Sequence, residues 1–315
     1  MFASAPLLTI TGETTDQGDG ANDDIHLHAG GQGVWIARQL AALGVDVALC
    51  ATFGGETGTV LETLVAGENV ELHAVATLHG NGAYVHDRRS GVREEIAALP
   101  PGTLSRHELD ELYGVTLAEA LHADVTVLGG PGAEGVIAAD TYRRMARDLG
   151  ANNKTVIADL SGADLDAAVA GGLTIVKVSH EELHADGRVT DPASLAQLVA
   201  AMEDLVERGA EAAVVTRAEA PTLALLDGEL VTAVAPSLEP IDNRGAGDSL
   251  TAGLAAALAR GSDRREALIL GVAAGAMNVT RRGLATGSRA EIERLADLVR
   301  VEPAMTSGRD HPCEH

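Results

Sequence analysis

An acidic residue follows a glycine-rich turn and opens a helix-forming run late in the chain. Asp248 comes directly after Gly245, Ala246 and Gly247, and a run of small apolar residues continues from Leu254. Because glycine lacks a Cβ atom, the backbone can adopt left-handed torsions and turn successive N–H groups toward one point at a positive helix N-terminus. Such a turn can bind a phosphate group. A carboxylate beside it could serve as the general base for an attacking hydroxyl group.

The same residues would also suit an ordinary helix start, in which Asp248 or Ser249 caps the first turn. The surrounding sequence favours an active site. An apolar, strand-like run at 231–236 comes before the turn, and a second helix of small residues is expected at 267–279.

Two separate motifs resemble those of the ribokinase-like (PfkB) sugar kinases. Residues 242–253 resemble the ATP-site signature DTxGAGDxFxAG, although Leu250 replaces its aromatic residue and Arg244 replaces a small one. Residues 28–44 resemble the N-terminal signature GGxGxNxAxxLAxLG, and a matching glycine turn follows at 53–58. The two signatures lie in the order that the family has, and the closest branch is that of the phosphofructokinases and tagatose-6-phosphate kinases.

The resemblance implies transfer of the γ-phosphoryl group of ATP to a hydroxyl group of a sugar or sugar phosphate. Asp248 would be the base, and Gly245, Ala246 and Gly247 would form the anion-binding turn. The resemblance assigns the nucleotide side of the site to Lys177, Ser179, Thr216, Arg217, Asp242 and Asn278. It assigns Mg²⁺ to Glu182, which is sufficient because Mg²⁺ needs only one or two carboxylates when phosphates and water supply the other ligands. A surface helix start with acidic residues is the alternative for Glu182.

The residues that would bind the acceptor depart from the family pattern. The resemblance places the acceptor at Asp16, Gly30, Gly31, Gln32 and Trp35, with Asp19, Asp23 and Asp24 as competitors of Asp16. Gln32 stands where the phosphofructokinase branch has a lysine, and Trp35 replaces an asparagine that holds sugar hydroxyls. The segment 80–85 lacks the arginine of that branch, so the charge complement of a phosphate is missing at two places.

Two further segments are open to more than one interpretation. Arg88, Arg89 and Arg93 either replace the missing charge or belong to a solvated loop. The loop 216–222 lacks the glycines with which relatives close over the nucleotide, and Pro221 stiffens it.

Apolar runs alternate with amphipathic helices over most of the chain, which predicts a parallel sheet covered on both faces. Strands are expected at 45–50, 125–128, 155–158, 173–177 and 212–216, and helices at 34–43, 136–148, 165–169 and 194–207. Two polar, alternating segments, about 7–29 and 72–99, predict a small antiparallel sheet. We therefore expect one α/β domain over 1–302, a three-layer α/β/α body with a mostly parallel sheet and a small β-sheet lid. A polar tail at 303–315 would follow, and in it His311, Cys313 and His315 are more readily explained by a disordered terminus than by a metal site.

Composition limits the partners. The chain has 315 residues, 46% of them hydrophobic, and a formal net charge of −23, which argues against nucleic acid and anionic membranes as partners. Two cysteines, Cys50 and Cys313, are too few for a disulfide framework, and neither a targeting segment nor a membrane span is evident, so we expect a cytoplasmic location. The family resemblance implies a homodimer formed through the lid.

Two other functions are compatible with parts of the sequence. A catalytically impaired relative that binds a metabolite or nucleotide would explain the altered acceptor residues and the altered loop at 216–222. A Rossmann-type oxidoreductase would share the α/β alternation, but no GxGxxG motif opens a first βαβ unit.

Overall fold

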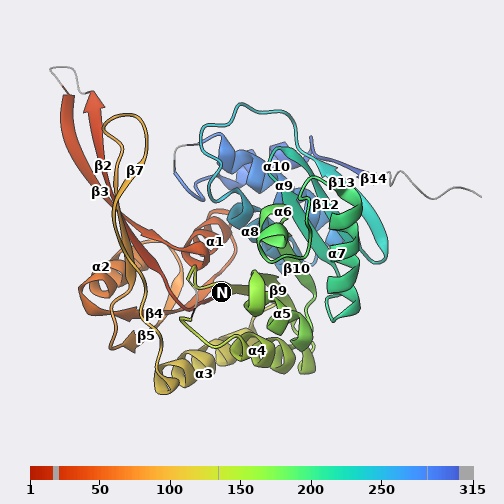
Figure 1. The fold of residues 1–315 in the computed structure, drawn as a ribbon, viewed down its shortest axis with the longest axis horizontal. Helices are drawn as coiled ribbons and strands as arrows, with labels where there is room; N and C mark the ends of the chain where they lie inside the picture. The colour runs from red at the N-terminus through yellow and green to blue at the C-terminus, as the bar shows by residue number, and fades with distance from the viewer. Residues whose placement is uncertain (17–20, 134, 282, 305–315) are drawn as a thin grey trace, which may run out of the picture.

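A ten-stranded sheet forms the centre of the computed structural model, which describes residues 1–16, 21–133, 135–281 and 283–304 (Figure 1). The strand order is β14-β13-β12-β11-β10-β9-β8-β1-β4-β5. The strands are β1 Phe2–Ala3, β4 Ala48–Gly54, β5 Glu71–Thr77, β8 Val125–Gly129, β9 Thr155–Asp159, β10 Ile175–Ser179, β11 Ala213–Arg217, β12 Ala220–Leu226, β13 Glu229–Val234 and β14 Arg300–Pro303. Every pair from β5 to β11 is parallel, whereas β12, β13 and β14 pair antiparallel at one edge.

Helices cover both faces of this sheet and make two separate hydrophobic cores. The helices are α1 Gln32–Ala42, α2 Gly55–Ala66, α3 Arg106–His122, α4 Asp140–Ala151, α5 Gly162–Gly171, α6 His180–Ala185, α7 Leu195–Glu207, α8 Ala246–Ala259, α9 Arg264–Val279 and α10 Arg289–Ala296. One core contains buried residues of α1, α2, α8, α9 and α10, and the other contains buried residues of α3 to α7. This arrangement confirms the predicted three-layer α/β/α body.

Local sequence explains the central layers. The strands β9 and β10 are buried along nearly their whole length, as expected for parallel strands with helices on both faces. The two small-residue helices α8 and α9 approach very closely, because a Cβ atom built on Gly253 would lie 2.6 Å from the Cα atom of Gly271. Their small side chains thus bring the glycine turn at the start of α8 close to the sheet.

The lid is a separate four-stranded sheet with the order β3-β2-β6-β7, and it rises from the body beside α1 and α2 (Figure 1). Its strands are β2 Leu7–Asp16, β3 Ala21–Gly30, β6 Gly82–Asp87 and β7 Glu94–Leu99. The β2–β3 and β6–β7 pairs are antiparallel, and β2 and β6 are joined in parallel.

Several predicted boundaries were wrong. The segment 71–77 belongs to the main sheet as β5 rather than to the lid, because it pairs parallel with β4. The strand predicted at 45–50 begins only at Ala48, and the helix predicted from 136 begins at Asp140. We did not predict α2 and α3.

The end of the chain continues the sheet beyond the predicted domain boundary, since Pro303 in β14 pairs with Val231. His311, Cys313 and His315 lie outside the described residues. Among the helices of the described ranges, none is both long enough and apolar enough to cross a membrane.

Candidate active site

The glycine turn predicted from the sequence forms the N-terminus of α8. Gly245 is the residue before the first helical turn and has left-handed torsions, with φ at 70° and ψ at 4°. Ala246, Gly247 and Asp248 follow in the first turn, whose N–H groups have no partners within the helix. The turn therefore has the geometry of an anion-binding helix start.

A buried lysine lies directly against this turn. The Lys177 ammonium group from β10 would be 2.7 Å from a Cβ atom built on Gly247, so a larger residue there would displace the end of the lysine side chain. Its Nζ atom donates to the Asp159 carboxylate at 3.0 Å, and the Thr251 hydroxyl of α8 donates to the same carboxylate at 2.6 Å. Lys177 and Asp159 are both almost completely buried. This ion pair fixes the start of α8 to the carboxyl ends of β9 and β10.

Asp248 is surrounded by other charged groups. Burial raises the pKa of Asp248 to about 7, helped by the negative charges of Asp159 and Glu182 and opposed by the Lys177 ammonium group. Burial disfavours the charge on Lys177, but Asp159, Glu182 and Asp248 outweigh it and raise the pKa of the ammonium group. Asp248 thus has the titration range of a general base that acts near neutral pH.

A cleft of about 770 Å³ lies on one side of the turn. The site residues Ala246 and Gly247 line it, together with Lys177, Ser179 and Thr216 from the ends of the sheet. Its remaining wall comes from the start of α6, the β11–β12 turn, the end of β13, the loop before α8 and the C-terminal half of α9. The volume is that of a site for a small organic ligand.

Glu182 lines the same cleft and has a structural role there. It forms a capping box with Ser179, in which the Ser179 N–H group donates to the Glu182 Oε2 atom at 2.7 Å. The described residues contain no group of three or more side chains arranged to hold a metal ion. A single carboxylate that lines a cleft of this volume fits Mg²⁺, which takes its other ligands from phosphate oxygens and water.

Three residues expected on the nucleotide side are engaged elsewhere. The Arg217 Nε atom donates to the Pro221 carbonyl oxygen at 2.7 Å, and Arg217 does not line the cleft. The Asn278 amide group is buried and bonds to the Arg244 carbonyl oxygen at 2.6 Å. Asp242 forms an ion pair with Arg244. Asn278 and Asp242 therefore hold the loop before α8 in place.

A second, smaller cavity of about 170 Å³ lies at the start of α1. Gly31, Gln32 and Trp35 line it, with Leu7 and residues that follow β8. Gly31 comes just before α1 and has a φ of 94°, a conformation that favours glycine. Gly30, at the end of β3, lies beside Trp35, because a Cβ atom on Gly30 would be 3.4 Å from the indole.

Gln32 connects this cavity with Asp248. Its Oε1 atom accepts a hydrogen bond from the Gly130 N–H group at 2.7 Å. The Gln32 side chain also lies near Asp248 and lowers the pKa of that carboxyl group against the larger effect of burial. Because Oε1 accepts from Gly130, the Nε2–H group is the one that can serve Asp248 as a donor.

The acceptor-binding role of Asp16 stays a prediction. Asp16 is the last residue of β2, and its side chain lies outside the described part of the chain. Leu7, at the other end of β2, lines the small cavity, and nine residues of strand span roughly 30 Å. Conversely, Asp159 and Thr251 belong to the site and were missed. The available signal was a carboxylate at the end of a buried strand.

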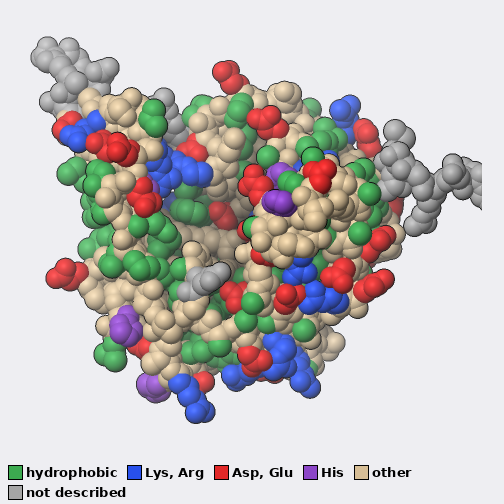
Figure 2. All heavy atoms as spheres, in the orientation of Figure 1, with side chains coloured by type: hydrophobic (Ala, Val, Ile, Leu, Met, Phe, Trp, Pro, Cys, Tyr) green, Lys and Arg blue, Asp and Glu red, His purple; other side chains and the backbone are tan. Residues whose placement is uncertain are grey.

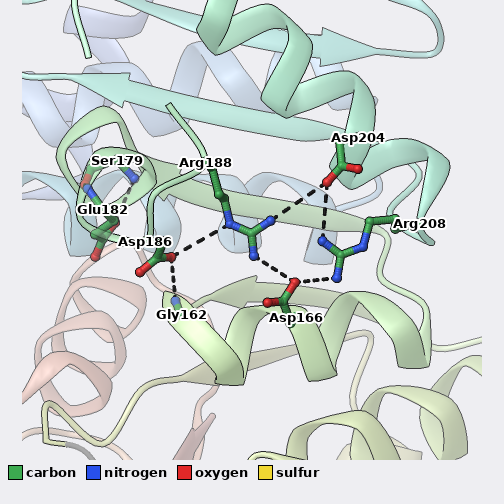
Figure 3. A network of polar contacts seen from close by, with 8 residues as sticks. All are labelled: Gly162, Asp166, Ser179, Glu182, Asp186, Arg188, Asp204 and Arg208. Atoms are coloured by element: carbon green, nitrogen blue, oxygen red, sulfur yellow. Dashed lines mark hydrogen bonds and ion pairs between the residues drawn. The ribbon is translucent and has the colours of Figure 1, made fainter. Parts of the chain in front are cut away.

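An arginine network supports the short helix that carries Glu182 (Figure 3). Arg188, after α6, donates to Asp166 of α5 at 2.8 Å and lies 3.9 Å from both Asp186 and Asp204. Asp186 accepts a hydrogen bond from the Gly162 N–H group at 2.6 Å. The network therefore joins α5, α6 and α7.

Replacing Arg188 by methionine is expected to lower the free energy of unfolding by about 1–3 kcal/mol, because three carboxylates lose one shared cation. Arg188 is 13% exposed, whereas Arg208, which contacts Asp166 and Asp204, is 39% exposed. Arg208→Met is the matched control, with an expected loss under about 1 kcal/mol. Denaturant unfolding measures both, and equal effects would contradict the central role of Arg188.

Known proteins resemble this chain over most of its length. A family profile described as pfkB family carbohydrate kinase matches residues 8–291. The 1-phosphofructokinase of Bacillus subtilis is 27% identical over 87% of this chain and 88% of its own length. The bifunctional protein HldE of Paramagnetospirillum magneticum is 31% identical over 87% of this chain, which spans about half (54%) of that protein.

A solved structure shares the fold. The Escherichia coli phosphofructokinase-2 in complex with potassium superposes with a TM-score of 0.82 at 24% identity, covering 94% of this chain and 97% of that one. The ribokinase of Thermotoga maritima gives a TM-score of 0.73 at 19% identity over 94% of this chain and all of that one (100%).

Proposed function

Because the chain belongs to the pfkB family of carbohydrate kinases, we propose that it transfers the γ-phosphoryl group of ATP to a sugar or sugar-phosphate hydroxyl, with Asp248 as the general base. One observation carries this proposal. Asp248 directly follows Gly247, which lines the large cleft, and its carboxylate is influenced by the side chain of Gln32, which lines the small cavity. A hydroxyl group in the small cavity and a phosphate in the cleft would meet at this carboxylate.

The proposed reaction uses the groups around the turn. Asp248 accepts the proton as the acceptor oxygen forms a bond to the γ-phosphorus, and the bond to the ADP oxygen breaks. The N–H groups of Gly245, Ala246 and Gly247 hold the phosphoryl oxygens in line. The adjacent Lys177 ammonium group adds positive potential to the same turn. Glu182 would hold Mg²⁺, which neutralises phosphate charge when bound.

The nucleotide would occupy the large cleft, where Lys177, Ser179 and Thr216 form part of the wall. We propose a positioning role for Asp242 and Asn278 through the loop before α8. Arg217 bonds back to Pro221 and is available to a nucleotide only if this bond opens.

An ATP-consumption assay with a panel of sugars, sugar phosphates and nucleosides tests the function. We expect turnover with at least one sugar or sugar phosphate. ATP binding with no turnover across the panel would instead support the impaired, metabolite-binding relative, because Asp248 and Glu182 would then be present without catalysis.

The pH dependence of turnover should respond to Gln32. Since a base must be ionised, kcat is expected to rise as the pH increases through about 7, the pKa of Asp248. Gln32→Leu removes the polar amide group that favours the carboxylate and should move this limb to higher pH. Gln39→Leu is a control, since Gln39 is buried and bonds to Gly287. If kcat of Gln32→Leu rises over the same pH range as that of the wild type, Gln32 does not influence Asp248.

We also propose a homodimer formed through the outer face of the lid. Strand registers place Leu27, Ile10, Val85 and Ala97 in one row, with Leu99 on the same face. Leu27 and Leu99 are 43% and 51% exposed, and Ile25 beside them is 67% exposed. An exposed apolar face of this kind typically marks a protein–protein contact.

The double variant Leu27→Lys/Leu99→Lys is expected to be monomeric in sedimentation velocity experiments, because lysine disfavours burial of this face. Leu298→Lys is the control. Leu298 is 60% exposed but lies just after α10, outside the lid, so this variant should remain dimeric. A double variant with the wild-type sedimentation coefficient would place the interface elsewhere.

A further inference from the structure

The inner face of the lid is polar, in contrast to its outer face. Strand registers align Thr9 with His28 and Tyr84, and Thr11 with His86. This face points toward the small cavity, since a Cβ atom on Gly30 would lie 3.1 Å from the Thr9 hydroxyl oxygen as well as beside Trp35. An acceptor that reaches out of the cavity would therefore contact these side chains.

Arginines gather where this face meets the body. Figure 2 shows Lys and Arg side chains beside the hollow between lid and body. Arg88, at the end of β6, lies 3.8 Å from Asp242 of the loop before α8 and 3.5 Å from Glu13. These distances are longer than charge-assisted hydrogen bonds. Its backbone N–H group donates to the Gly12 carbonyl oxygen at 2.8 Å, so the arginine is anchored at its backbone while its guanidinium group is held, among the described residues, only by these two long ion pairs.

A second arginine and a histidine complete the group. The Arg93 guanidinium group contacts the His86 Nε2 atom, and burial together with the Arg88 charge lowers the pKa of Arg93. His86 is only 4% exposed. Since its Nε2 atom faces a guanidinium donor, Nδ1 carries the proton, and Nδ1 is buried without a hydrogen-bond partner among the described residues. His86 is therefore a neutral neighbour that holds the Arg93 guanidinium group from within the lid.

The nearby carboxylates do not satisfy these donors. Asp242 is already bonded to Arg244 through both carboxylate oxygens. Glu13 and Glu95 are the other acidic groups that face Arg88 and Arg93. Each guanidinium group has five N–H donors, which is more than the acceptor atoms around Arg88 and Arg93 can satisfy.

We propose that Arg88, Arg93 and His86 form a subsite for an oxyanion, phosphate or carboxylate, carried by the acceptor at the end remote from its reacting hydroxyl group. The proposal rests on the kinase function given above. Planar guanidinium groups bind such oxyanions in pairs of parallel hydrogen bonds. The subsite would provide the charge that is missing at Gln32 and in the segment 80–85, from different positions of the chain.

Trp35 offers a direct test, since it is the only tryptophan of the 315 residues and lines the small cavity. Fructose 6-phosphate, gluconate and fructose are titrated against tryptophan fluorescence without nucleotide. We expect an anionic sugar to bind at least tenfold more tightly than fructose. Arg88→Gln and Arg93→Gln should each weaken that binding about tenfold or more, and the preferred anion identifies phosphate or carboxylate as the natural group.

Arg89→Gln is the matched control, because Arg89 lies in the same turn but pairs with Asp87 and Asp23. It should bind the anionic sugar within about twofold of the wild type. Equal affinities for fructose and both anionic sugars would overturn the subsite, as would equal effects of the three arginine variants. If no sugar binds, inorganic phosphate is titrated by calorimetry against the wild type and the Arg88→Gln/Arg93→Gln variant, and equal heats would overturn it.

Turnover separates this subsite from the kinase function. If the enzyme phosphorylates a neutral sugar, and Arg88→Gln and Arg93→Gln leave kcat/KM for that sugar unchanged, the kinase function is supported and the oxyanion subsite is excluded. If an anionic sugar binds through these arginines but ATP is not consumed with any acceptor, the oxyanion subsite is supported and the kinase function is excluded.

Discussion

Replacing Asp248 by asparagine is expected to lower turnover by about 10²- to 10⁴-fold, because asparagine cannot accept the proton of the acceptor hydroxyl. Nucleotide affinity should change little, since the cleft is lined by Ala246 and Gly247 and not by Asp248. Steady-state kinetics and calorimetric titration with an ATP analogue measure the two quantities. A variant with wild-type turnover would remove Asp248 from the mechanism.

The same variant has a predicted effect on stability. Because burial raises the pKa of Asp248 to about 7, the contribution of this group to stability is fully present below about pH 4 and is lost as the pH rises through 7. Asp248→Asn should therefore become increasingly more stable than the wild type between about pH 4 and pH 7, and the difference should level off above pH 7. Asp297→Asn, at an exposed position after α10, should show no such trend. If the free energy of unfolding changes with pH in the same way in Asp248→Asn and in the wild type, ionisation of Asp248 does not destabilise the folded protein.

The glycine turn could be predicted because its determinants are local. Left-handed torsions at Gly245 and a helix start at Ala246 depend on a few consecutive residues, and these are legible in the sequence. The resemblance to a known family added the position of the second motif at Gly31 and Gln32. Both motifs meet in the structure at Asp248, through the side chain of Gln32.

The Asp159–Lys177 pair could not be predicted in the same way. The two residues lie 18 positions apart and become neighbours only because β9 and β10 are adjacent, with Asp159 directly opposite Lys177 in the register. Thr251 comes from a third element, 92 positions from Asp159. A local pattern carries no information on strand order, so a buried carboxylate at the end of an apolar strand was the only signal.

The missed helices have different causes. The adjacent glycines Gly54 and Gly55 are typical of a turn, whereas Gly55 has a φ of 63° and begins α2 directly. The helix α3 has no clear apolar stripe, although Ser105 and Glu108 form a capping box that the sequence shows as S-x-x-E. A capping box marks where a helix can begin, but without a periodic apolar pattern after it the sequence does not predict a helix. The antiparallel edge strand β14 was hidden in the same way, because its residues are largely exposed.

Replacing Lys177 by methionine is expected to lower the free energy of unfolding by about 3–5 kcal/mol, because it leaves the buried Asp159 carboxylate without its cation. The Lys177 side chain is 6% exposed and that of Asp159 is 1% exposed, so water cannot take the place of the ammonium group. Loss of the ammonium group also removes the one cation that lowers the pKa of Asp248. The rising limb of the pH–kcat profile should therefore move to higher pH, an effect that simple loss of packing would not produce.

The double variant Lys177→Met/Asp159→Leu tests whether the loss comes from an uncompensated charge. If it does, removing the carboxylate as well should recover most of the stability, because apolar replacements of a buried ion pair are often neutral. Lys154→Met is the control, since Lys154 makes a single 3.3 Å contact with the Ala123 carbonyl oxygen and should lose little. Denaturant unfolding of the four variants, Asp159→Leu included, gives the coupling energy. If the losses of unfolding free energy in Lys177→Met and Asp159→Leu simply add in the double variant, the two residues stabilise the fold through packing and not through their ion pair. The ion pair would then not be what stabilises Lys177 beside the glycine turn.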